Sequence, residues 1–159
     1  MRDAAVNDKG MIGDVCREAL IEGKYVADSE MFVMWKRRLK EGDAKNDWIM
    51  DGFPRNVDQA TFLDDKLSKY GYKVEAVFYL KISEVESLKR LMKRARPLHP
   101  GSLELHDSPG RIRTRLQIYK EGETAVLDYY RKQGVLVEMN AELPPEEVHK
   151  AIVSQIHHG

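Results

Sequence analysis

The sequence lacks the features that mark several classes of protein. Its 26 basic and 26 acidic residues leave no net charge, so the sequence predicts no attraction to bulk nucleic acid or to an anionic membrane. No apolar run approaches the length of a membrane span, and no signal peptide opens the chain. The single cysteine, Cys16, excludes an internal disulfide, and we expect a small core residue in a reducing cytoplasm.

A glycine-rich phosphate loop of the form G-x-x-x-x-G-K-[ST] is also missing from the sequence. Nevertheless, Asp51-Gly52-Phe53-Pro54-Arg55 follows the apolar run Trp48–Met50 and is typical of a turn that approaches a phosphate. Glycine allows a ligand close to the backbone, proline fixes the turn, and arginine offers a planar fork to phosphate oxygens.

Hydrophobic spacing predicts helices that alternate with strands along 159 residues, most simply as one domain. Asn56 with Gln59, and Ser83 with Glu86, predict capping boxes at two helix starts, while the segment 97–108 predicts a loop. This alternation indicates an α/β fold with a parallel sheet. The expected helices are 11–22, 29–41, 56–71, 84–95, 109–120, 123–132 and 144–157, and the expected strands are 48–50, 76–80 and 135–139.

Two groups of arginines are candidates for binding an anion. Arg90 and Arg94 lie one turn apart, opposite the apolar side of their helix. They could form a solvated helix face or face a cleft closed by the following loop, and the spacing leaves both interpretations open. Arg115 flanks an apolar stripe and can reach into a site while its stem packs, whereas Arg113 points to solvent.

The histidines predict no metal centre, because their spacing is not that of metal ligands. We expect all of them to be solvated: His99, His106, His149, His157 and His158.

An ordered series of motifs resembles the adenylate kinases, within the nucleoside monophosphate kinases, over essentially the whole chain. The resemblance implies a P-loop-kinase-like parallel sheet flanked by helices in one domain, 1–159, with AMP-binding helices in 1–27, a short lid at 95–108 and the remainder as core. The matching pieces are Gly23–Asp28, Ile49–Arg55, Gln59, Arg90, Arg94, Asp107-Ser108-Pro109, Arg113, Arg115-Leu116, Tyr119, Tyr129-Tyr130, Gly134 and Asn140-Ala141.

The resemblance implies reversible phosphoryl transfer from Mg-ATP to AMP, giving two ADP. On the AMP side, Arg55 would hold the phosphate, with Gly52 and Val26 against the nucleoside. Gln59 would read adenine, because a carboxamide can both donate and accept, and it favours AMP over UMP or CMP. We expect a cytoplasmic monomer with no nucleic-acid or membrane partner.

On the ATP side, the resemblance places Arg90 against the base, near Asn140. It places Arg94 on the phosphates and Arg115 near the transferred group. Asp51 would order the magnesium shell through water, without a direct metal ligand from the chain. Such chemistry needs distributed positive charge more than covalent catalysis.

The chain departs from the family in its first segment and in its lid. It begins after the family's first strand, phosphate loop, first helix and second strand, so we expect the first two strands to be absent and the chain as written to be inactive. A mis-assigned start at Met1 would explain this. Asp3 stands where the family has an AMP-phosphate arginine, Glu104 where the lid has another, and His106 replaces one of two paired aspartates.

Two further interpretations compete with a kinase. The first is a catalytically dead nucleotide-binding or regulatory module that keeps the AMP contacts. The second is RNA binding through the arginine clusters, which the zero net charge and the lack of interleaved aromatics disfavour.

Overall fold

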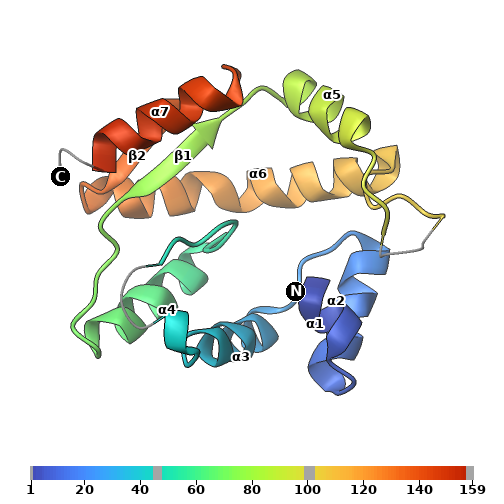
Figure 1. Cartoon of the computed structure of the whole chain (residues 1–159), viewed down its shortest axis with the longest axis horizontal. Helices are drawn as coiled ribbons and strands as arrows, with labels where there is room; N and C mark the ends of the chain where they lie inside the picture. Colours follow the sequence, from blue (N-terminus) through green and yellow to red (C-terminus); the bar gives the residue numbers. More distant parts are fainter. Residues whose placement is uncertain (1, 45–47, 99–102, 157–159) are drawn as a thin grey trace. The chain divides into compact units, whose positions relative to one another are not determined.

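The computed structural model describes residues 2–44, 48–98 and 103–156, which fall into two compact units (Figure 1). Unit 1 comprises 1–52 and 91–117, and unit 2 comprises 53–90 and 118–159. Two helices have residues in both units: α5, Glu84–Arg94, and α6, Pro109–Lys132. Among the described residues, none of the helices is long and apolar enough to span a membrane.

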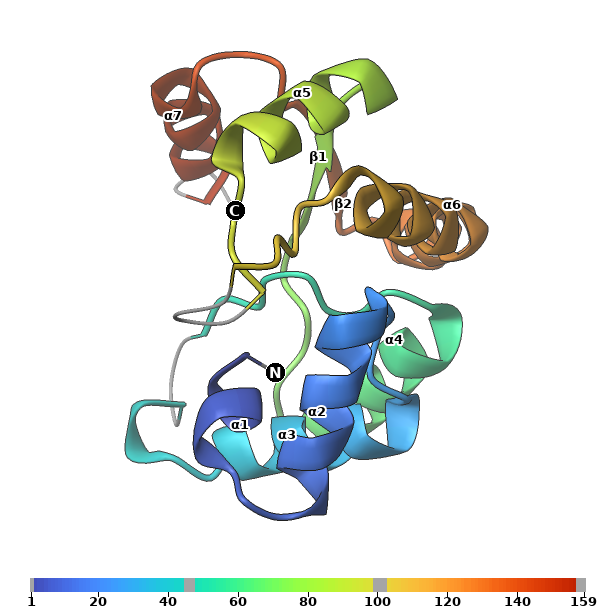
Figure 2. The same cartoon turned by 90° about the vertical axis from the view of Figure 1, so that its right-hand side faces the viewer.

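Unit 1 is helical. It contains α1 (Arg2–Asn7), α2 (Met11–Glu22), α3 (Asp28–Arg38) and a 3-10 turn, η1 (Gly42–Ala44). The predicted bounds of α2 are confirmed, and α2 lies beside α1 in Figure 1 and Figure 2. The expected helix 29–41 ends at Arg38, and α1 was not predicted.

The end of α2 follows from glycine. Gly23 has φ 70°, a left-handed conformation that costs other residues energy, and Lys24 N–H donates to the Ala19 carbonyl at 2.9 Å. Cys16 is fully buried, as predicted for a core residue. Its core cluster also contains Ala5, Ile12, Ala19, Leu20, Val26 and Leu98.

Unit 2 contains α4 (Val57–Ser68), β1 (Val77–Lys81), β2 (Leu136–Asn140) and α7 (Pro145–Ile156). The strands pair in parallel, with Val77 opposite Leu136 and Lys81 opposite Asn140. The predicted α/β architecture with a parallel sheet is therefore confirmed for two strands, each one residue later than expected. Ala60, Val126 and Tyr130 form the buried cluster beneath them.

The expected strand at 48–50 is wrong. This segment has no strand assignment, and Ile49 is 94% exposed. A strand needs a neighbouring backbone to bond with, and within the described residues 48–50 has none.

The expected break between the helices 109–120 and 123–132 is also wrong, because α6 is continuous. Gly122 lies at this point of α6, where the backbone packs closely: a Cβ on it would lie 2.6 Å from the Arg55 carbonyl oxygen. The glycine thus marks a close backbone approach rather than a helix end.

At both predicted helix starts the residue before the helix forms its cap bond. Asn56 Oδ1 accepts from Gln59 N–H at 2.8 Å, so that cap is confirmed. Ser83 Oγ accepts from Glu86 N–H at 3.3 Å, but the return bond is wrong because Glu142 Oε1 takes the Ser83 N–H at 3.0 Å.

The segment 97–108 is mostly irregular, as expected, but is pinned by one antiparallel bridge between Pro97 and Leu105. His106 N–H donates to the Arg96 carbonyl at 2.9 Å, and the expectation of a solvated His106 is wrong, because the residue is only 8% exposed. His99, His157 and His158 lie outside the described residues, as does part of the expected lid at 95–108.

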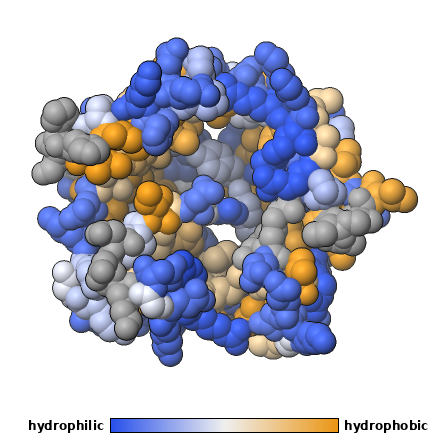
Figure 3. Space-filling view, viewed as in Figure 1, coloured by the Kyte–Doolittle hydropathy of each residue, from blue (hydrophilic) through white to orange (hydrophobic). Residues whose placement is uncertain are grey.

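Apolar side chains reach the surface in both units, and Figure 3 shows them interspersed with hydrophilic ones on one face. Met11 and Ile21 are exposed in unit 1, and Leu80 and Val85 in unit 2.

Candidate functional site

The most buried polar cluster in unit 1 is built around one carboxylate. The Asp107 side chain is 0% exposed and accepts two bonds from Arg94, Nε to Oδ2 at 2.7 Å and Nη2 to Oδ1 at 2.9 Å. Arg115 Nη2 donates to Oδ1 at 3.1 Å, and Arg96 N–H donates to Oδ2 at 3.2 Å. Two predicted site arginines are thus brought together by a residue that sequence analysis did not select.

The electrostatics of this cluster favour ionised Asp107. Burial alone would raise the pKa of its carboxyl, but the hydrogen bonds from Arg94, Arg96 N–H and Arg115 hold that pKa well below its ordinary value. The hydrogen bond to Asp107 in turn raises the pKa of the Arg94 guanidinium. Two positive groups on one negative group leave a net positive charge.

Both arginines keep unused donors. Within the described part of the chain, Arg94 Nη1 and the Nε and Nη1 of Arg115 make no hydrogen bond. Arg113, on the same helix, is exposed, as predicted. The arrangement can therefore accept an anion with several oxygens, such as a phosphate.

Arg111 has a structural role that sequence analysis missed. Its Nε donates to the Ile21 carbonyl at 2.9 Å, at the end of α2, and its Nη1 donates to the Leu105 carbonyl at 3.0 Å. Its Nη2 pairs with Glu104 at 2.9 Å. The position on the flank of an apolar stripe was visible in the sequence, but its carbonyl partners were not.

The other candidates in unit 1 lie apart from this cluster of bonds. Val26 is 3% exposed, with its side chain in the core, while Asp51 and Gly52 are exposed. Gly52 has φ 69°, so the turn requires glycine there. Asp3, at a position where the family has arginine, accepts from Asn7 Nδ2 at 2.6 Å.

In unit 2 the structure joins two predicted AMP-side residues. Arg55 N–H donates to Gln59 Oε1 at 2.7 Å, and Gln59 is 4% exposed. The carboxamide oxygen assigned to adenine is thus bound to the Arg55 backbone in this structure. This bond fixes the chain at the point where the Arg55 side chain leaves it.

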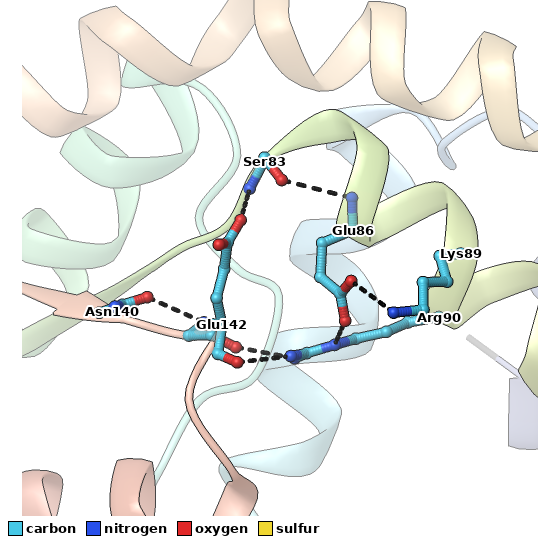
Figure 4. A network of polar contacts seen from close by, with 7 residues as sticks. Ser83, Glu86, Lys89, Arg90, Asn140 and Glu142 are labelled. Atoms are coloured by element: carbon cyan, nitrogen blue, oxygen red, sulfur yellow. Dashed lines mark hydrogen bonds and ion pairs between the residues drawn. The ribbon is translucent and has the colours of Figure 1, made fainter.

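Arg90 is bound at the end of the sheet (Figure 4). Its Nε donates to Glu86 Oε1 at 2.7 Å, its Nη1 to the Ala141 carbonyl at 2.7 Å and its Nη2 to the Glu142 carbonyl at 3.1 Å. The side chain nevertheless remains 42% exposed. Both Arg90 and Arg94 are hydrogen-bonded, and each side chain also remains about 40% exposed, so the two interpretations stay open.

The turn that receives Arg90 is itself fixed. Asn140 Oδ1 accepts from Glu142 N–H at 3.0 Å, and the Glu142 carboxylate accepts from Ser83 N–H (Figure 4). Hydrogen bonding by the Ser83 side chain, and then by its backbone, holds the pKa of the Glu142 carboxyl below its ordinary value. Arg90 and Asn140, predicted to share the ATP base, thus meet at one turn.

The chain offers little to a directly bound metal. In the described residues no three His, Cys, Asp or Glu side chains gather as a metal site. Magnesium that travels with a nucleotide keeps several waters and takes few protein carboxylates, so a single exposed carboxylate such as Asp51 fits that preference.

An open pocket of about 280 Å³ lies elsewhere in unit 2 and contains none of the predicted site residues. It is lined by Tyr79, Lys81, Glu123, Thr124, Leu127, Asp128, Arg131 and Glu138.

Comparison with known proteins agrees with the motifs. The adenylate kinase family model matches residues 1–135. The adenylate kinase of Streptomyces avermitilis is 31% identical over 169 residues, covering 91% of this chain and 77% of that protein. Adenylate kinase 1 of Synechocystis is 33% identical, covering 91% and 73%, and the adenylate kinase of Thermobifida fusca is 35% identical, covering 86% and 70%. The resemblance is confirmed, and this chain belongs to the adenylate kinase family.

Proposed function

We propose that this chain binds AMP and Mg-ATP and transfers a phosphoryl group reversibly between them, giving two ADP. The observation that carries the proposal is the pair of arginines, Arg94 and Arg115, held by one buried carboxylate, with further donors unused among the described residues. Transfer of a phosphoryl group depends on fixed positive charge around the phosphate oxygens, which this pair supplies.

The ATP side uses three arginines in different roles. Arg94 binds the phosphates of ATP, Arg115 lies at the transferred group, and Arg90 lies against the base near Asn140. When bound with ATP, magnesium would neutralise charge on the phosphates, and Asp51 would order one of the waters around it.

The AMP side uses side chains and backbone. Arg55 binds the phosphate, and Gln59 both orients Arg55 and reads adenine. Gly52 gives the nucleoside close access to the backbone. Val26 contributes its backbone, because its side chain is committed to the core. We expect the chain to act as a cytoplasmic monomer, without a nucleic-acid or membrane partner.

A second candidate is a module that binds nucleotides but does not catalyse phosphoryl transfer. One observation favours it: Glu104 stands at a lid position where the resemblance implies a phosphate arginine. In this interpretation the arginines bind nucleotides without completing a catalytic site.

A coupled assay for ADP formed from ATP and AMP tests the proposal, with calorimetric titration of each nucleotide in parallel. We expect Arg115→Ala to lower turnover by about 100-fold, as for other preorganised cationic contacts, and the exposed control Arg113→Ala to leave it unchanged. AMP binding without turnover would support the second candidate. If neither nucleotide binds, both candidates fail.

A further inference from the structure

Arg90 differs from the lid arginines in how its guanidinium is used. All three of its nitrogens donate, to Glu86 Oε1, the Ala141 carbonyl and the Glu142 carbonyl. These bonds lie in the guanidinium plane, because N–H bonds leave the group in that plane. Each of its nitrogens is therefore held by an acceptor, while the side chain is still 42% exposed.

An arginine bound along its edges offers a ligand its flat face. A guanidinium face stacks on aromatic rings, and Arg is well suited to this because the group is planar and weakly hydrated. A phosphate could reach Arg90 only through the second N–H of Nη1 or Nη2, because Nε and one N–H of each terminal nitrogen already donate. By contrast, Arg94 keeps a donor nitrogen unused within the described residues.

The acceptors of these bonds differ. Two are carbonyls of a turn that is fixed by Asn140 and by the Glu142–Ser83 bond (Figure 4). The third is Glu86, one turn before Arg90 on α5, whose carboxyl pKa is lowered chiefly by the Arg90 hydrogen bond. Glu86 is therefore the third acceptor that holds the guanidinium plane, together with the two carbonyls.

We propose that Glu86 is a positioning residue that, with the carbonyls of the turn at 140–142, locks Arg90 as a flat platform for the adenine base of ATP. The inference rests on the proposed function, in which Arg90 lies against that base. It adds a residue outside the resemblance motifs and a physical reason why Arg90 contacts a base whereas Arg94 contacts phosphates.

Titration of the full chain with ATP and with inorganic tripolyphosphate tests this platform. Tripolyphosphate carries the charge of ATP without a base, so only ATP reports on stacking. We expect Glu86→Gln to weaken ATP binding about threefold and to leave tripolyphosphate binding unchanged, consistent with one exposed cation–π contact. The matched control is Glu84→Gln, also on α5, whose carboxylate pairs with Lys120 and not with Arg90.

A double-mutant cycle tests whether Glu86 acts through Arg90. Arg90→Lys removes the planar group, so we expect it to weaken ATP binding by a similar factor. The variant carrying both changes should then bind ATP no more weakly than Arg90→Lys alone, because one interaction has been removed twice. Additive losses would overturn the positioning role.

Other outcomes of the titration also decide the question. Unchanged ATP binding in Glu86→Gln overturns the inference, as does an equal loss for ATP and tripolyphosphate, which would indicate general disruption. Stronger binding of both ligands would mean that Glu86 only screens charge. Failure of the unaltered chain to bind ATP contradicts the proposed function itself.

The lock can be measured without any nucleotide. In ¹⁵N NMR of the ligand-free chain, we expect the Arg90 Nε–H to exchange slowly with water and to exchange faster in Glu86→Gln. Rapid exchange in the unaltered chain would refute the lock even if ATP binds. This result separates failure of the inference from failure of the proposed function.

Discussion

The two units hold their arginines in opposite ways. In unit 1, Arg94 and Arg115 share the carboxylate of Asp107, which is fully buried. In unit 2, Arg90 is bound to two backbone carbonyls and to Glu86, and 42% of its side chain is exposed. Arg94 is about as exposed as Arg90, at 40%, so the two units differ in the acceptor, which is a buried carboxylate in one and two carbonyls with a partly exposed carboxylate in the other.

The difference matters because charge is expensive to bury and inexpensive to expose. Removing one partner of a buried ion pair lowers the free energy of unfolding much more than removing one partner of an exposed pair, because the remaining buried charge is left uncompensated. We therefore expect the Asp107 cluster to contribute to stability as well as binding, and the Arg90 network to contribute mainly to geometry. The following predictions test that contrast.

The largest effect is expected at Asp107. Asp107→Asn preserves side-chain volume but removes the negative charge between Arg94 and Arg115. We expect the free energy of unfolding to fall by about 3 kcal/mol, measured by urea denaturation. Asp128→Asn, which breaks the exposed Arg131–Asp128 pair, is the control and should change it little. Equal losses in both variants would remove the distinction between buried and exposed pairs.

The next effect separates the two ends of α6. Gly122→Ala would put a Cβ 2.6 Å from the Arg55 carbonyl in unit 2, so the backbone must shift, and we expect a loss of about 2 kcal/mol in unfolding experiments. Gly110→Ala, in unit 1, meets nothing within 4 Å and should be neutral or slightly stabilising. A neutral Gly122→Ala would show that this close approach does not constrain the helix.

These residues also show which features can be predicted from sequence. Local signals were sufficient for α2, which ends at Gly23, and for the cap at Asn56, because both depend on neighbours within a few residues. Buried-type apolar runs predicted β1 and β2 to within one residue. The strand at 48–50 failed because a strand depends on a distant partner backbone. The break expected after residue 120 failed because α6 is continuous through Gly122.

The candidate site was predictable in its residue types but not in its bonds. Arg90, Arg94 and Arg115 were selected from helix spacing and from the resemblance. Asp107 lies 13 residues from Arg94, and Arg90 reaches a carbonyl 51 residues away, so no local pattern encodes these contacts. They depend on where the loop after α5 and the turn after β2 fold back.

The third prediction sharpens the contrast through pH. The pKa of Asp107 is lowered in the folded chain, so its stabilisation is fully present above the unfolded pKa of about 4 and is lost as pH falls toward the folded pKa. Between about pH 6 and pH 3 we expect the unaltered chain to lose about 1 kcal/mol more than Asp107→Asn, measured by urea denaturation at each pH. Identical pH dependences would show that Asp107 gains nothing from its partners.

The smallest effect on stability is expected at Glu86. Because its bond to Arg90 is exposed and the two carbonyl bonds remain, we expect Glu86→Gln to shift the thermal unfolding midpoint by less than about 1 °C. The same variant should still weaken ATP binding, whereas Asp107→Asn should lower both stability and binding. Scanning calorimetry with and without ATP gives both quantities in one experiment, since a bound ligand raises the midpoint according to its affinity. If the midpoint of Glu86→Gln without ATP fell by more than this, the Arg90 network would contribute to stability. The proposed contrast between the two units would then be wrong.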